Sequence, residues 1–249
     1  SGLSDAMEID VGGTTTDVGQ LKNGFPREAN SVVKVGGVRT LFRMPDLLSI
    51  GLGGGSHVQL EPLKVGPISV GYRLLRDGIA FGGKQLTTTD VAIAAGVLTL
   101  GDRAKVAHLD AATCKKVFAE AARLSEEAID RMKTEAGDVP LIAVGGGAFL
   151  IPEKLPGVSK VIHVQHGDCA NAVGAAIAQV SGECDQIFKD MTRNEALAAA
   201  QGIANDRAVA AGAERKTLST IESEDMPLAY LPGNSVRVRV RVVGDVAGS

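Results

Sequence analysis

The stretch Ile9-Asp10-Val11-Gly12-Gly13-Thr14-Thr15-Thr16-Asp17 joins an apolar strand to a glycine pair and three hydroxyl residues, with an acid on either side. Because the glycines lack a Cβ atom, the backbone NH groups of such a turn approach phosphate oxygens closely. Threonine hydroxyls add hydrogen-bond donors, and Asp10 has the chemistry to hold hydrated Mg²⁺. A hairpin with local threonine and aspartate hydrogen bonds is the alternative for a bare Gly-Gly pair. The complete stretch favours a loop that binds nucleotide phosphates.

Two further glycine clusters lie downstream. The first, Gly51-Leu52-Gly53-Gly54-Gly55-Ser56, has four glycines in its first five positions. Close approach of backbone to a ligand and a mobile hinge or lid explain that density equally well. The second cluster, at 144–148, follows a buried-strand pattern and predicts either an adenosine contact or a tight crossover. Three such loops in one chain strengthen the ligand interpretation of each.

Short strands alternate with helices along the rest of the chain. Apolar residues at steps of three and four, beginning at Phe118 and Ala121, predict a helix over 110–134. Thr192 and Glu195 have the spacing of a capping box, which predicts a helix that ends at Gly212. We also expect strands at 6–11, 18–21, 141–144, 161–164 and 236–243, and helices at 89–100 and 170–180. The order of strand, turn and helix is typical of an α/β protein.

Composition narrows the function classes. The 249 residues contain 26 Lys plus Arg against 29 Asp plus Glu, a formal net charge of −3, so nothing points to a nucleic-acid partner. Aromatic residues make up 3%, with no Trp, which argues against a surface built on several stacking platforms. The 45% hydrophobic content is typical of a globular protein with one large domain or two small ones.

The cellular location is predicted from the absence of membrane-span and secretory patterns in the sequence and from its few cysteines. No apolar run reaches the roughly 18 residues of a membrane span, and the N-terminus shows no secretory signal pattern. Cys114, Cys169 and Cys184 form no CxxC pair, and this sparse, odd count is typical of free thiols in a reducing compartment. We therefore expect a cytoplasmic protein without membrane contact.

Two polar patterns have competing explanations. His163-x-x-His166-x-Asp168-Cys169 contains the side chains that bind zinc, but a strand end that enters a helix favours turn and capping roles. The spacing alone leaves metal binding open. Arg237, Arg239 and Arg241 alternate with valines, which predicts a half-buried strand with a solvated basic face; contacts with phosphates or acidic partners are the alternative.

The motifs together resemble the hydantoinase A/oxoprolinase family of the actin-like ATPase superfamily. Residues 10–17 look like a phosphate motif of the superfamily, and the downstream series is similar to the family over most of the chain. That series comprises Gly36-Gly37-Val38, Gly51 to Ser56, Val65-Gly66-Pro67, Thr87-Thr88-Thr89-Asp90, Gly145 to Ala148 and Pro227 to Gly233. The resemblance implies an α/β actin-like (ribonuclease H-like) lobe, a mixed β-sheet flanked by helices, over residues 1–190. It implies a C-terminal helix and strand extension, packing on that lobe, over 191–249.

The resemblance also implies roles for individual residues. ATP and Mg²⁺ are the expected cofactors, with Asp10 as metal ligand through water and Asp10 and Asp90 as candidate catalytic groups. Asp90 has a helix-start role as its alternative. The residues expected at the ATP phosphates are Gly12, Gly13, Thr14, Thr15 and Thr16, and those expected beside adenosine are Gly145, Gly146 and Gly147. The residues expected on the substrate side of the cleft are Gly53, Gly54, Gly55 and Ser56.

Family members contain two lobes, each with a phosphate loop, and use ATP to open a cyclic amide. This chain has one such loop and therefore looks like the C-terminal lobe alone, with a short regulatory homologue as the alternative. The implied partners are a cyclic amide such as a hydantoin or 5-oxoproline, the missing N-terminal lobe and a hydantoinase B-type subunit. We expect an ATP-dependent hydrolase that phosphorylates the amide oxygen. A small-molecule kinase of the same superfamily and a non-catalytic nucleotide-sensing module are the alternatives.

Overall fold

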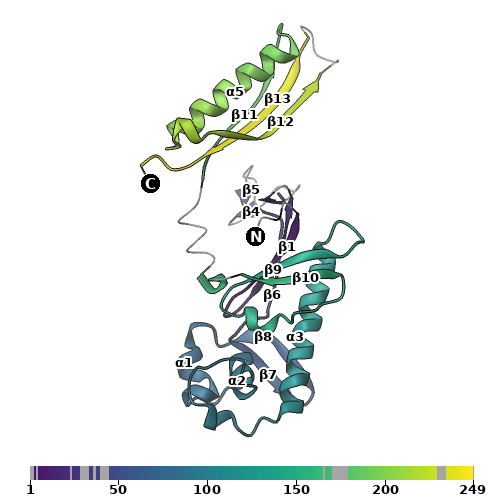
Figure 1. Cartoon of the computed structure of the whole chain (residues 1–249), viewed down its shortest axis with the longest axis vertical. Helices are drawn as coiled ribbons and strands as arrows, with labels where there is room; N and C mark the ends of the chain where they lie inside the picture. The colour runs from purple at the N-terminus through teal and green to yellow at the C-terminus, as the bar shows by residue number, and fades with distance from the viewer. Residues whose placement is uncertain are drawn as a thin grey trace. The chain divides into compact units, whose positions relative to one another are not determined.

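The computed structural model describes residues 3, 5–22, 24–28, 34–35, 38–39, 45–164, 166–169, 179–228 and 234–248, with backbone alone at 34–35, 38–39 and 169. The chain divides into two compact units, Ser1–Ala170 and Asn171–Ser249 (Figure 1). Each unit has its own sheet and its own buried apolar cluster, so each is treated separately below.

Strand β1 (Ala6–Val11) lies inside the mixed six-stranded sheet of the first unit. It pairs in parallel with β9 (Val139–Val144) and antiparallel with β2 (Thr16–Lys22). The strand order is β10-β9-β1-β2-β3, and β6 also pairs with β2. The outer strands are β10 (Val158–His163), β3 (Phe25–Pro26) and β6 (Leu47–Ile50). Because β1, β9 and β10 are parallel, the loops that follow them meet at one edge of the sheet.

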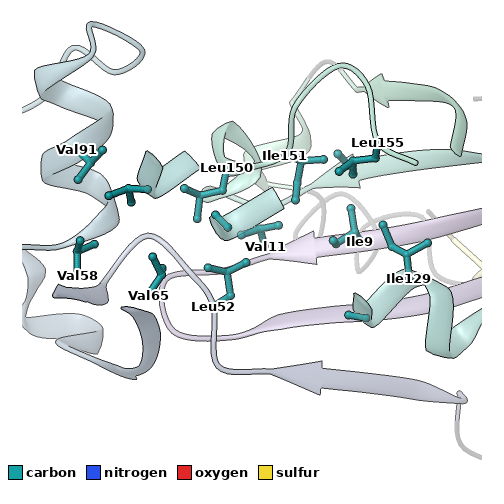
Figure 2. Close-up of a cluster of buried hydrophobic side chains, with 14 of the residues drawn as sticks. Ile9, Val11, Leu52, Val58, Val65, Val91, Ile129, Leu150, Ile151 and Leu155 are labelled. Carbon is teal, nitrogen blue, oxygen red and sulfur yellow. The ribbon is translucent and has the colours of Figure 1, made fainter. Parts of the chain in front are cut away.

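Helix α3 (Ala111–Met132) runs beside this sheet and confirms the helix predicted over 110–134 (Figure 1). Asp110 caps it by accepting a hydrogen bond from the Thr113 NH at 2.7 Å. Its apolar face joins one core with the inward side chains of β1, including Ile9 and Val11, which are fully buried. Figure 2 shows Ile129 of α3 in the same cluster as these two residues. Burying each such side chain contributes about 1.5 to 3 kcal/mol.

Smaller elements cover the end of the sheet beyond the phosphate-type turn. An unpredicted antiparallel hairpin, β7 (Ser56–Leu60) and β8 (Leu63–Ser69), follows the second glycine cluster. Helix α2 (Thr88–Ala94) is shorter than the helix predicted over 89–100, because Gly96 adopts φ +78° two residues after its end. The other short elements are β4 (Lys34–Val35), β5 (Val38–Arg39), η1 (Gly71–Arg73), α1 (Leu74–Asp77), η2 (Ile79–Phe81), η3 (Arg103–Val106), η4 (Ala148–Leu150) and η5 (Gly167–Cys169).

The second unit is an antiparallel sheet with one helix on it. The strand order is β11-β13-β12, formed by β11 (Val180–Phe188), β13 (Val236–Gly244) and β12 (Ser219–Pro227). Helix α5 (Arg193–Ala210) begins with the predicted Thr192 and Glu195 capping box and packs through a stripe of buried alanines. A Cβ at Gly182 would lie 2.1 Å from the Ala204 carbonyl oxygen, so small residues let helix and sheet approach closely. A short helix, η6 (Arg215–Thr217), precedes β12.

The unit boundary falls earlier than the division at 190 and 191 that the sequence suggests. The whole of β11 pairs with β13, so backbone hydrogen bonds assign it to the second unit. Of the helix predicted over 170–180, residues 170–178 lie outside the described residues, and Val180 begins β11. The motif residues Gly36, Gly37 and 229–233 also lie outside the described part of the chain.

The arginines of β13 form a charged face that is neutralised within the second unit. Arg237 makes a bidentate pair with Asp185 of β11, at 2.7 and 2.8 Å. Arg239 lies 2.9 Å from Glu222 of β12. An exposed ion pair such as that of Arg237 contributes about 0 to 1 kcal/mol, so this pair adds little to the stability of the fold. In the described ranges, no helix is long and apolar enough to cross a membrane.

Candidate functional site

The turn between β1 and β2 presents free backbone donors to solvent. The Gly12 NH closes the turn by donating to the Thr15 carbonyl oxygen at 2.9 Å, which leaves Gly13 and Thr14 at the tip. Gly13, Thr14 and Thr15 are exposed. Within the described residues, the NH groups of Gly13 and Thr14 donate no hydrogen bond. A Cβ built at Gly13 meets nothing within 4 Å, so the space beside the tip is open to a ligand.

Carboxylates face one another just before this tip. Asp10, the last but one residue of β1, is the register partner of Asp17 in β2. Like charges directly opposite in an antiparallel pair destabilise it, and a bound cation would remove that cost. Asp17 accepts a short hydrogen bond from Ser49, whereas Asp10 has no partner among the described residues. Glu8 lies two residues before Asp10 on the same face of β1. Its pKa is raised mainly by burial and secondly by the negative charge of Asp10.

The third glycine loop lies against this carboxylate. A Cβ at Gly145, whose φ is +90°, would lie 2.4 Å from an Asp10 carboxylate oxygen. Gly147 donates its NH to the Val11 carbonyl oxygen at 2.7 Å, and its own Cβ position is 2.7 Å from the Gly12 oxygen. Gly146 is exposed with open space around it. The carboxyl ends of parallel β1 and β9 thus bring Asp10, the turn and this loop together.

Thr16 occupies a different place from the one expected of a phosphate contact. Its side chain is fully buried, and its hydroxyl donates to the Leu52 carbonyl oxygen at 2.8 Å. The hydroxyl is buried and therefore not open to a ligand, and its hydrogen bond to Leu52 holds the second glycine cluster against β2. Thr14 and Thr15 are the hydroxyls that the turn leaves accessible.

The second glycine cluster packs against the backbone of the turn. The residues expected on the substrate side of the cleft, Gly53, Gly54, Gly55 and Ser56, are all buried. The loop supports the turn from beneath, because the Gly54 and Gly55 NH groups donate to the Gly12 and Gly13 oxygens at 3.0 and 2.7 Å. A Cβ at Gly53 would lie 2.7 Å from three backbone atoms of residues 12–14. Gly53 and Gly55 are therefore required by close contact with the backbone of the turn.

Asp90, expected as a candidate catalytic group or a helix-start acid, is a buried cap. Its side chain is fully buried and accepts hydrogen bonds from the NH groups of Thr87 at 2.8 Å, Ala80 at 2.7 Å and Ile79 at 3.2 Å. It also accepts from the Thr87 hydroxyl at 2.8 Å. This is the helix-start role that the sequence left open, extended to a second segment of chain.

Metal binding by the histidine pattern receives no support. Among the described residues, which include His163, His166 and Asp168, no group of three or more His, Cys, Asp or Glu could hold a metal ion. Mg²⁺ does not need such a group, because it is held by one or two carboxylates together with phosphates and waters. Cys114 and Cys184 are free thiols in buried positions.

Sequence reasoning missed two carboxylates that border the site. Glu8 shares the Asp10 face because side chains two apart on a strand point the same way. The position of Asp17 follows from the register of the hairpin. Gly12 and Thr15 close the turn, and two residue pairs further along the strands Asp10 lies opposite Asp17. Hairpin register was therefore the signal that would have found Asp17.

The topology and the site together define an actin-like, ribonuclease H-like α/β lobe with a glycine-threonine turn at the sheet edge. The family model for hydantoinase/oxoprolinase matches residues 1–135, more than half of the chain. The chain belongs to the hydantoinase/oxoprolinase family.

Two solved structures share the fold across almost the whole chain. One is a nucleotide-free acetone carboxylase, described as carrying out ATP-dependent acetone carboxylation, with 17% identity and a TM-score of 0.66. The other is an ATP-dependent caprolactamase from Pseudomonas jessenii, with 17% identity and a TM-score of 0.64. Each similarity covers 98% of this chain and 47% of the other, so this chain spans about half the length of both. A search of curated proteins found no match.

Proposed function

We propose that this chain supplies one phosphate-binding half of an ATP-dependent hydrolase that opens a cyclic amide. The observation that carries the proposal is the exposed Gly13-Thr14 tip, with free NH donors, beside the facing carboxylates of Asp10 and Asp17. Family membership supplies the reaction class, and both structural relatives are named as ATP-dependent enzymes.

The residues present fit a nucleotide phosphate with its cation. The NH groups of Gly13 and Thr14 and the hydroxyls of Thr14 and Thr15 would donate to phosphate oxygens. Asp10 would hold Mg²⁺, with Asp17 opposite it, and the cation would offset the repulsion between the two carboxylates. Gly145 and Gly147 let the third loop approach the end of β1, and the exposed Gly146 is the part of that loop left to border adenosine.

ATP would supply a phosphoryl group that converts the amide oxygen into a leaving group. The work of this chain is then positional and electrostatic, since fixed NH donors and a held cation stabilise charge without reorganising. A ring-opening hydrolase rather than a kinase is proposed because the family, and the caprolactamase relative by its name, act on such substrates. Hydantoin and 5-oxoproline are the proposed substrates.

A complete site needs a second phosphate loop from another lobe. Both structural relatives are about twice as long as this chain, which supports an N-terminal lobe as the missing half. A hydantoinase B-type subunit is the proposed further partner and the cytoplasm the proposed location. Alone, the chain is expected to bind nucleotide weakly and to turn over little ATP.

Isothermal titration with Mg-ATP tests the proposal. Gly13→Val adds a side chain into the open space at the tip and is expected to weaken binding about tenfold or more. Gly137→Val is the matched control, because Gly137 is also exposed with nothing within 4 Å of its Cβ position. Equal affinity in both variants, or a folded wild-type chain that binds no Mg-ATP, would contradict the proposed half-site. Turnover with an added N-terminal lobe, giving ADP and either an opened ring or a stable phosphorylated substrate, separates hydrolase from kinase.

A further inference from the structure

The first unit contains a cavity that shares no residue with the phosphate turn. It has a volume of about 450 Å³ and lies between helix α3 and the chain that leads from β6 through the buried glycine cluster to β8. Ile50, Leu52, Val65 and Leu124 give it an apolar wall, and Asp130 and Arg131 stand at its rim. The volume is within the range of pockets that hold small molecules.

The rim presents one free charge of each sign. Glu127, which also lines the cavity, is paired with Arg123 one turn earlier in α3. Asp130 and Arg131 are exposed, and no described residue forms a hydrogen bond or ion pair with either. Asp130 and Arg131 are consecutive residues of α3, so a carboxylate and a guanidinium border the apolar wall and complement a molecule that carries an ammonium, a carboxylate and an apolar chain.

We infer that this cavity binds an α-amino acid with an apolar side chain. The ammonium would pair with Asp130, the carboxylate would take two hydrogen bonds from the Arg131 guanidinium, and the side chain would enter the apolar wall. The choice of ligand rests on the two rim charges and the apolar wall, and it does not depend on the proposed function.

The cavity wall is continuous with the support of that turn. Leu52, one of the residues around the cavity, accepts the Thr16 hydrogen bond through its carbonyl at 2.8 Å. The next residues along the chain donate to the Gly12 and Gly13 oxygens. A bound amino acid thus contacts the same backbone segment that positions the phosphate turn, and coupling between the two sites must be reciprocal.

The test is an NMR titration of the isotope-labelled chain with L-leucine, 4-methylpentanoate and 3-methylbutylamine. The last two keep the apolar chain and lose one charge each. Leucine is expected to bind about five to ten times more tightly than either, with shifts at residues of the cavity wall. Arg131→Gln should reduce leucine affinity to that of the amine, and Asp130→Asn to that of the acid. Lys115→Gln, an exposed position on α3 outside the cavity, should leave it unchanged.

Equal affinity for the three probes, unchanged affinity in both rim variants, or shifts confined to other surfaces would overturn the inference. A second titration measures Mg-ATP affinity with and without saturating leucine. A change in Mg-ATP affinity of about twofold or more that disappears in Arg131→Gln supports the coupling. An unchanged Mg-ATP affinity refutes the coupling, and the NMR titration with leucine then decides whether the amino-acid site exists. Leucine binding by a chain that binds no Mg-ATP would refute the proposed function and keep the amino-acid site.

Discussion

Two glycine clusters that look alike in sequence, at 12–13 and at 51–55, have different environments: the first is exposed at Gly13 and the second is buried from Leu52 to Gly55. The turn at Gly12 and Gly13 is open, with free NH groups and room around Gly13. The cluster at 51–55 is closed, because its NH groups are already bonded to the turn and to its own loop. A cluster of glycines therefore indicates that the backbone comes close to another group. It does not indicate whether that group belongs to a ligand or to another part of the chain.

The closed cluster holds the open turn in place by hydrogen bonds to its backbone. Carbonyl oxygens of the turn accept from the loop beneath, and the loop's own carbonyls accept from Thr88 and Thr89 of α2 at 2.6 to 2.8 Å. The Asp90 cap fixes the start of α2 in turn. The turn is thus supported by two successive layers, the glycine cluster and the start of α2. Four substitutions test this arrangement and the carboxylates beside it.

The largest effect is expected at the deepest layer. Asp90→Ala removes the acceptor of three backbone NH groups and should cost about 4 kcal/mol of unfolding free energy. Urea denaturation measures it. Asp110→Ala, which removes an exposed cap of α3, is the control and should cost about 1 kcal/mol. A stable Asp90→Ala protein that loses turnover when the N-terminal lobe is added would support Asp90 as a catalytic group.

The glycine cluster beneath the turn is tested by comparing the same Gly→Ala substitution in each of the two clusters. Gly53→Ala places a Cβ 2.7 Å from the backbone of the turn and should destabilise the chain by about 2 to 3 kcal/mol. Gly13→Ala has open space and a φ outside the left-handed region, so its unfolding free energy should change by less than about 0.5 kcal/mol. Thermal unfolding compares them. Equal losses of stability would mean that the two clusters are not distinguished by packing.

The next effect concerns two adjacent threonines. Thr16→Val keeps the shape of a buried side chain and loses its bond to Leu52, which should cost about 1 kcal/mol of stability. Thr15→Val alters an exposed hydroxyl and should leave stability unchanged while weakening Mg-ATP binding about threefold. Denaturation and titration on both variants check this. The reverse pattern would place the phosphate contact at Thr16.

The smallest effect is a pH dependence at Glu8. Its pKa is raised from an ordinary value of 4.5, so the folded state binds the Glu8 proton more tightly than the unfolded state does. The resulting stability is present below the ordinary pKa and is lost as pH rises through the raised one. Glu8→Gln should therefore stabilise the chain at pH 7, and this gain should vanish near pH 4. Unfolding measured across that pH range decides it, and a gain that persists at low pH would exclude the charge of Glu8 as its cause.

Regular periodicity let the sequence predict several elements correctly. The three- and four-residue steps of α3, the capping box of α5 and the Val-Arg alternation of β13 each depend on neighbouring residues alone. The hairpin of β7 and β8, and the strands β11 and β12, lack such a pattern and were not predicted. Their residues are held by pairing with distant partners, as β11 is by β13.

By itself, the sequence determined the family of the protein and the place of a glycine-threonine turn after an apolar strand, because both depend on residues that are neighbours in the chain. Only the tertiary structure decided which glycines and acids are exposed. Gly53 and Asp90 are buried by segments far away in the chain, whereas Gly13 and Asp10 lie at an open sheet edge. Exposure depends on which distant backbone comes close, and no local pattern encodes that.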